Sequence, residues 1–127
     1  MGVQFVTRID ISKYKCVSEH IVTDEVVITV ERIQHLKGRH PNDFEQYEKY
    51  IRAVIEQPDY ILEANKPNTA FLLKSFTEEE NRFELILRLA VNGDPEGYKN
   101  SVITFLKVSP KRYNRYLRTK KILYKSE

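Results

Sequence analysis

The sequence predicts one α+β domain, with N-terminal helices packed on a four-stranded antiparallel sheet, short extra strands before them and a helix near the C-terminus. Three observations lead to this prediction. Between residues 29 and 57, apolar side chains recur at helical spacing. From residue 59 to residue 108 the period changes to two, in four segments separated by short turns. No Pro-, Gly- or Ser-rich linker divides the 127 residues, so residues 1–127 are expected to share one core.

The extra strands are predicted at residues 3–9 and from about residue 14 to residue 30. Both segments are rich in Val, Ile, Thr and Phe and show no helical periodicity. A short helix is predicted next, over 29–37, because Val30, Ile33 and Leu36 follow one another at intervals of three. Gly38 is the stop signal that follows it.

A second helix is predicted to begin after Asn42, which is a favourable N-cap with Glu45 at the capping-box position. Pro58 ends it. Its apolar stripe consists of Phe44, Tyr47, Ile51, Val54 and Ile55. Between the two helices, Pro41 disfavours helical angles at His40, so this histidine is expected at a corner of the chain.

Four strands are predicted after the second helix. Their ranges are 59–64, 69–76, 83–91 and 101–108. The short connections imply an antiparallel meander with the helices packed on one face. In the third strand an apolar row alternates with Glu84 and Arg88, so these two side chains should lie on the face away from that row. Pro110 is predicted to start the last helix.

The charge is unevenly distributed along the chain. The net charge is only +3, but the segment from Lys107 to Lys125 contains eight basic residues and no acid. Such a segment fits a phosphate-facing surface, because each Lys or Arg that neutralises a phosphate releases counterions. A solvated helix face is an equally simple interpretation.

Cysteine content and hydropathy indicate the compartment. Cys16 is the single cysteine, so no intrachain disulfide can form, which suits a reducing compartment. No stretch approaches the roughly 18 apolar residues needed to span a bilayer, and the N-terminus lacks the features of a signal peptide. We expect a cytoplasmic protein without membrane contact, although a fragment of a larger secreted protein would look the same. Cysteine and histidine spacing gives no zinc site and no glycine-rich phosphate loop is present, so neither metal nor cofactor is expected.

A series of short motifs follows the predicted elements in order. They are RHP (39–41), PDYILE (58–63), NKPNTA (65–70), LRL (87–89), KNSVITF (99–105) and KILYK (121–125). In this series the chain resembles the phage-associated branch of the barnase/EndoU/colicin/RelE ribonucleases, over about residues 25–125. The resemblance implies a metal-free site that cleaves RNA on the open face of the sheet. For a toxin of this kind, an immunity or antitoxin protein is an expected partner.

Cleavage of this kind uses the 2′-hydroxyl of RNA as nucleophile, so the protein must supply a base, an acid and positive charge. His40 matches the family's histidine position, and histidine is a natural proton carrier because its unperturbed pKa of about 6.5 lies near working pH, so His40 is the expected acid or base. Its structural alternative is to stabilise the corner between the helices. Arg88 and Lys74 are the candidates for stabilising charge, and Lys74 could lie on either face. Lys99 and Asn100 are further candidates for phosphate contacts.

Three more candidates would position the substrate. The resemblance favours Ser101, Thr104 and Tyr124 for this role. Ser101 and Thr104 lie on opposite faces of a regular strand, so both can line one site only if the strand contains a bulge. Ordinary strand propensity would also explain Thr104, and closure of the core would explain Tyr124. Glu84 is a reserve base, because barnase-like enzymes use a glutamate.

The sequence therefore predicts a metal-independent endoribonuclease, as a toxin or phage effector that leaves a cyclic phosphate. Two alternatives stay open. A non-catalytic module would bind RNA through the basic segment, and that binding would survive His40→Ala. A protein-interaction domain anchored by Tyr113, Tyr116 and Tyr124 would neither bind nor cleave RNA.

Overall fold

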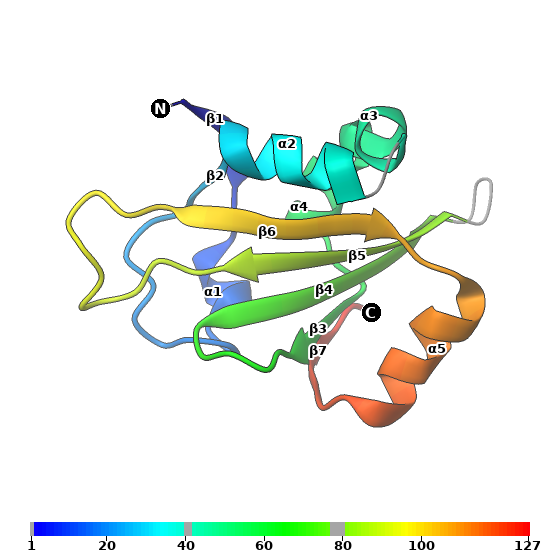
Figure 1. The fold of residues 1–127 in the computed structure, drawn as a ribbon. Coiled ribbons are helices and arrows are strands. Elements are labelled where there is room, and N and C mark those ends of the chain that lie inside the picture. Colours follow the sequence, from blue (N-terminus) through cyan, green and yellow to red (C-terminus); the bar gives the residue numbers. More distant parts are fainter. Residues whose placement is uncertain (1, 40–41, 77–80) are drawn as a thin grey trace.

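The computed structural model describes residues 2–39, 42–76 and 81–127 (Figure 1). Within these residues, one mixed sheet has the strand order β1-β2-β6-β5-β4-β3-β7. The strands are β1 (Val3–Arg8), β2 (Glu25–Thr29), β3 (Tyr60–Glu63), β4 (Thr69–Phe76), β5 (Asn81–Arg88), β6 (Asn100–Lys107) and β7 (Ile122–Lys125). The helices are α1 (Ile11–Tyr14), α2 (Val30–Arg39), α3 (Asp43–Tyr47), the 3₁₀ helix η1 (Glu48–Tyr50), α4 (Ile51–Glu56) and α5 (Pro110–Thr119). No helix among the described residues is both long and apolar enough to cross a membrane.

The α+β class and the central meander are as the sequence predicts, but the four-stranded sheet is wrong. Strands β3, β4, β5 and β6 are antiparallel neighbours in sequence order. At one edge of the meander, β2 pairs with β6 in parallel, and β1 pairs with β2 in antiparallel orientation. On the other side, β7 pairs with β3. The sequence did not reveal these pairings because β2 meets β6 across more than 70 residues, and β7 is too short to show alternation.

The helical segment between β2 and β3 also differs from the prediction. The first predicted helix is α2, close to its expected bounds. The second is broken into α3, η1 and α4, and Asn42 adopts a φ of 75° without a side-chain capping bond, so the capping box is wrong. Aromatic packing accompanies the break. The rings of Tyr47 and Tyr50 both lie on Phe83, with centroids 5.3 and 5.2 Å away.

Helices cover both faces of the sheet rather than one. The main core lies between one sheet face and the N-terminal helices, and it includes Leu36 of α2, Val54 of α4 and Phe83 of β5. Helix α5 packs on the opposite face through Tyr113, and Figure 1 shows it well apart from α2 and α3. It buries the second apolar face of the meander there, which consists of Leu62, Phe71, Leu73, Leu106 and Val108. Strands that are apolar on both faces need cover on both.

Asn100 joins the N-terminal hairpin to the meander. It opens β6 beside the two-residue parallel pairing with β2, and it is fully buried. Its Oδ1 accepts a hydrogen bond from the backbone N–H of Ala90 at 2.7 Å. Its Nδ2 donates to the carbonyl oxygens of Thr23 at 2.8 Å and Glu25 at 2.9 Å. The short parallel junction therefore depends on a side chain as well as on backbone ladder bonds.

Replacing Asn100 with Ala should destabilise the protein by about 3 kcal/mol, because each buried polar group left without a partner costs roughly 1–3 kcal/mol. Urea denaturation measures this as a lower midpoint with an unchanged slope. Asn114→Ala on the exposed surface of α5 is the matched control and should shift stability by less than about 0.5 kcal/mol. Equal effects of the two variants would contradict the role given to Asn100.

Candidate functional site

A bulge in β6 turns Ser101 and Thr104 to the same face of the sheet. Arg88 pairs with Ser101, Leu87 with Val102 and Ile86 with Thr104, which leaves Ile103 without a register partner in β5. Ser101 and Thr104 can face the same side only if the strand contains a bulge, and that bulge is present. Both lie on the face of the sheet opposite the main core, Ser101 beside Arg88 and Thr104 beside Ile86, although neither is among the residues that line the pocket on this face.

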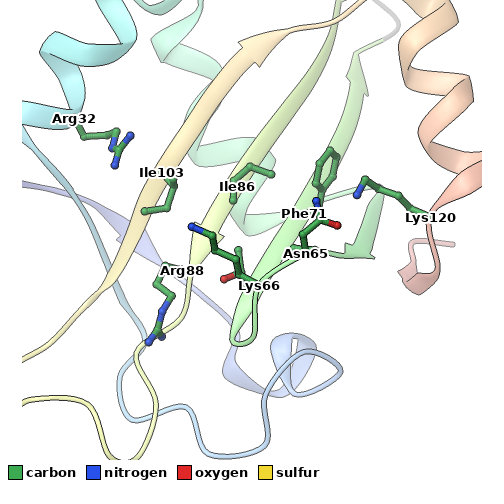
Figure 2. A pocket seen from close by; sticks show the side chains of 10 residues that line it. Arg32, Asn65, Lys66, Phe71, Ile86, Arg88, Ile103 and Lys120 are labelled. Carbon is green, nitrogen blue, oxygen red and sulfur yellow. The ribbon is translucent and has the colours of Figure 1, made fainter.

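A pocket of about 460 Å³ opens on this face (Figure 2). Its floor is an apolar row that crosses three adjacent strands, with Ile103 from β6, Ile86 from β5 and Phe71 from β4. Its polar lining comes from separate parts of the chain and consists of Arg32, Asn65, Lys66, Thr69, Arg88 and Lys120. An apolar floor under a polar rim is the usual composition of a ligand site.

Three cations on the rim have no carboxylate partner in the part of the chain that the structure describes. Within the described ranges, no carboxylate lies within 4 Å of Arg32, Lys66 or Lys120. The ammonium of Lys120 lies 4.7 Å from the ring centroid of Phe71. Figure 2 shows Arg32 and Lys120 at opposite ends of the apolar row. Unpaired positive charge around a concave surface attracts anions.

Arg88 also lines the pocket, but the loop after β5 holds its guanidinium. Its Nη2 lies 3.1 Å from Oδ1 of Asp94, Nη1 donates to the carbonyl oxygen of Leu89, and the ring of Tyr98 lies 5.6 Å away. Asp94 also accepts from the backbone N–H of Val91 at 2.8 Å. That backbone hydrogen bond, aided by Arg88, lowers the pKa of Asp94 below its usual range. In Figure 2 the guanidinium points away from the apolar row.

Glu84 lies on the same face, where α5 covers it. Only 8% of its side chain is exposed. Its Oε1 accepts from the hydroxyl of Tyr116 at 2.8 Å and lies 3.6 Å from Nη2 of Arg112. Arg112 also donates from Nε to that hydroxyl at 2.5 Å. Burial is the main cause of a raised pKa at Tyr116. The cluster fixes a carboxylate beside the ring of Phe71, which packs edge-on against Tyr116.

Lys74 and Tyr124 are not brought to this pocket. Lys74 pairs in register with Phe83, which places it on the face of the main core. Its Nζ donates to the carbonyl oxygen of Gln57 at 2.6 Å. Tyr124 pairs with Ile61 and packs against the same core. Both side chains therefore lie on the opposite face of the sheet from Arg88.

The remaining sequence candidates have other positions. His40 lies outside the described residues. Lys99 forms an ion pair with Glu25 at 2.7 Å, and Asn100 is the buried junction residue. Among the described residues, no cluster of three or more His, Cys, Asp or Glu side chains is arranged to hold a metal ion.

Sequence reasoning did not single out Arg32, Lys66 or Lys120 as site residues. Lys120 belongs to the basic C-terminal segment, whose charge was noted as a whole. Lys66 belongs to the turn motif NKPNTA. Arg32 lies off the apolar stripe of its helix and carried no signal of its own, because its place at the pocket follows from where α2 lies beside β6.

Comparison with known proteins gives one family. The family model described as phage-Barnase-EndoU-ColicinE5/D-RelE like nuclease2 matches residues 4–125. The match includes the N-terminal hairpin, which the resemblance in the motifs had left out. No curated protein and no solved structure gives a significant match.

Asp94→Asn should lower the thermal midpoint at pH 7, because it removes the carboxylate that holds Arg88. The folded-state pKa of Asp94 lies below its unfolded value of about 3.9, so the carboxylate stabilises the fold above that pH. The stabilisation is lost as the pH falls through the folded-state pKa. Thermal unfolding should therefore show a gap between variant and wild type at pH 7 that narrows in acid.

Asp24→Asn is the control for this measurement, because its ion pair with Arg8 is largely exposed and should contribute little. A gap at Asp94 that is the same at neutral and acid pH would contradict the assignment.

Proposed function

Because this chain belongs to the phage-Barnase-EndoU-ColicinE5/D-RelE like nuclease 2 family, we propose that it is a metal-independent endoribonuclease whose site is the pocket on the open sheet face. Family membership gives nuclease function in general, and the RNA substrate and metal independence are the proposed part. The observation that carries the proposal is the set of unpaired cations around an apolar floor. Such a surface suits a substrate with anionic phosphates and apolar base faces.

The proposed reaction is an internal transfer at phosphorus. The 2′-oxygen of the RNA forms a bond to the adjacent phosphorus, and the bond from phosphorus to the 5′-oxygen breaks. A base takes the proton of the 2′-hydroxyl, and an acid gives a proton to the departing 5′-oxygen. The products carry a 2′,3′-cyclic phosphate and a 5′-hydroxyl. Cations stabilise the extra negative charge of the phosphorane between them.

Side chains on the open face would supply this charge and the hydrogen bonds to phosphate. The pairing of β5 with β6 sets Ser101 beside Arg88 and Thr104 beside Ile86 on this face. Arg88 must exchange Asp94 for a phosphate oxygen before it can act on the substrate. Since a phosphorane carries more charge than the diester, this exchange favours the transition state, and Arg88 should affect kcat more than KM.

His40 and Glu84 are the candidates for the two proton transfers. Support for His40 comes from the family's histidine position and from the pKa range of imidazole. Support for Glu84 comes from its place on the open face and from the two donors that fix its carboxylate. Because α5 covers most of Glu84, it can reach a substrate only if that helix shifts, and His40 is the first residue to test.

A second candidate function is RNA binding without cleavage. It is favoured by the ion pair of Arg88 with Asp94, which engages the cation proposed to stabilise the transition state, while the rim cations Arg32, Lys66 and Lys120 have no carboxylate partner among the described residues. If the protein is a toxin, we also propose an immunity or antitoxin partner. An acidic surface that covers the pocket would suit its unpaired cations.

The test is incubation of total RNA with wild type and His40→Ala, once with Mg²⁺ and once in excess EDTA, followed by analysis of the product ends. Wild type should leave 2′,3′-cyclic phosphates. The variant should be slower by about 10²–10⁴-fold, the usual contribution of general acid–base catalysis. His35→Ala removes an exposed histidine of α2 and should retain wild-type activity. Intact RNA with all three proteins would favour the binding module, and cleavage that stops in EDTA would exclude metal independence.

A further inference from the structure

The apolar row and the two cations at its ends define a path across the sheet. Resting on the proposed function, we propose that Arg32 and Lys120 bind two phosphates of one RNA strand whose intervening bases are unpaired and lie on Ile103 and Ile86, between the two charges. The RNA would then run from α2 to α5, across β6, β5 and β4 rather than along them.

The dimensions of the row fit a short stretch of one strand. Neighbouring strands of a sheet are about 4.8 Å apart, so side chains on three strands cover roughly 10 Å. Arg32 reaches the β6 end of the row from α2, and Lys120 reaches the β4 end from the residue after α5 (Figure 2). The two charges come from opposite walls, so a strand that contacts both must cross the floor between them.

The floor favours unpaired bases. The faces of bases are apolar and accessible only where the bases are not stacked within a duplex. Ile103 and Ile86 are partly exposed and present carbon atoms, with no donor or acceptor that could read a base edge. Phe71 is only 6% exposed beneath the ammonium of Lys120 and closes the β4 end of the row. Thr69 lines the same pocket, but its hydroxyl donates to the carbonyl oxygen of Pro67 at 2.9 Å. The row should therefore accept different bases and discriminate against duplex RNA.

Two of the other cations near the pocket already have carboxylate partners. Arg88 is paired with Asp94, and Arg112 with Glu84. Lys66, on the rim, has no carboxylate partner among the described residues and could add a third phosphate contact. Of the basic C-terminal segment, only Lys120 lines the pocket. Phosphate binding should thus depend on particular basic residues of that segment and not on its total charge.

The experiment measures binding of a fluorescent 2′-O-methyl RNA, which lacks the nucleophilic hydroxyl and stays uncut, over a series of salt concentrations. Each phosphate contact to a single strand contributes about 0.7 to the slope of log K against log salt. Arg32→Gln and Lys120→Gln should each reduce that slope by about 0.7, and the double variant by about 1.4. Lys111→Gln, which removes an exposed charge from the start of α5, is the matched control and should leave the slope unchanged.

Two further arms test the bases. Wild type should bind the single strand at least about tenfold more tightly than the same sequence in a duplex. An oligonucleotide with abasic positions should bind with an affinity lower by a factor of about five or more, because it lacks the base contacts that contribute to affinity in single-strand sites. Its salt slope should be unchanged, because its phosphates are the same. The path would be overturned if the duplex or the abasic strand bound as tightly as the intact single strand. It would also be overturned if the salt slopes of the Arg32 and Lys120 variants did not differ from that of the Lys111 variant.

The outcomes also separate this path from the nuclease proposal. If the slopes change as expected but ordinary RNA stays intact with wild type, the path holds and the nuclease proposal fails. If ordinary RNA is cleaved while the slopes are insensitive to both variants, the nuclease proposal holds and the path is wrong. Absence of any binding overturns the path.

Discussion

The arrangement of the open face depends on the buried amide of Asn100. This side chain binds backbone groups on both sides of the junction, Thr23 and Glu25 before and at the start of β2, and Ala90 after β5. It therefore fixes β2 beside β6 and also fixes where the loop after β5 leaves the sheet. That loop carries Asp94, which holds Arg88. The buried, fully hydrogen-bonded amide of Asn100 thus links the order of the strands to the position of the Arg88 guanidinium on the open face.

Local pattern predicted those parts of the fold that are set locally. Strand β4 occupies the predicted range, and alternation in β5 placed Glu84 and Arg88 on one face. Pairings between distant segments, as of β2 with β6, leave no trace in local periodicity. The predicted second helix is divided into three short helices where Tyr47 and Tyr50 pack on Phe83, a tertiary contact that local propensity does not contain. The alternation of polar and apolar residues could not show on which face of the sheet Lys74 lies, because its strand is apolar on both sides. It could not place Tyr124 either, because that strand has only four residues.

The site was only partly predictable for a related reason. The sequence shows which residues are charged, but the structure shows which charges are paired. Arg88 and Lys99 have carboxylate partners, whereas Arg32, Lys66 and Lys120 have none among the described residues. A paired cation must lose its partner before it binds a phosphate, and an unpaired one need not. Under the proposed mechanism, the unpaired cations would bind the substrate in its ground state, and Arg88 would stabilise the transition state.

The bulge in β6 has a consequence for how relatives of this chain can vary. Ile103 is the residue without a partner, and the side chains on either side of it already face where a regular strand would place them. Loss of its single codon would restore a regular ladder with Ser101 and Thr104 still on the open face. The fold would be kept, but the pocket floor would shrink at the end nearest Arg32. Gain or loss of one codon is thus a simple evolutionary route to a nuclease that accepts a different stretch of nucleic acid on the same scaffold.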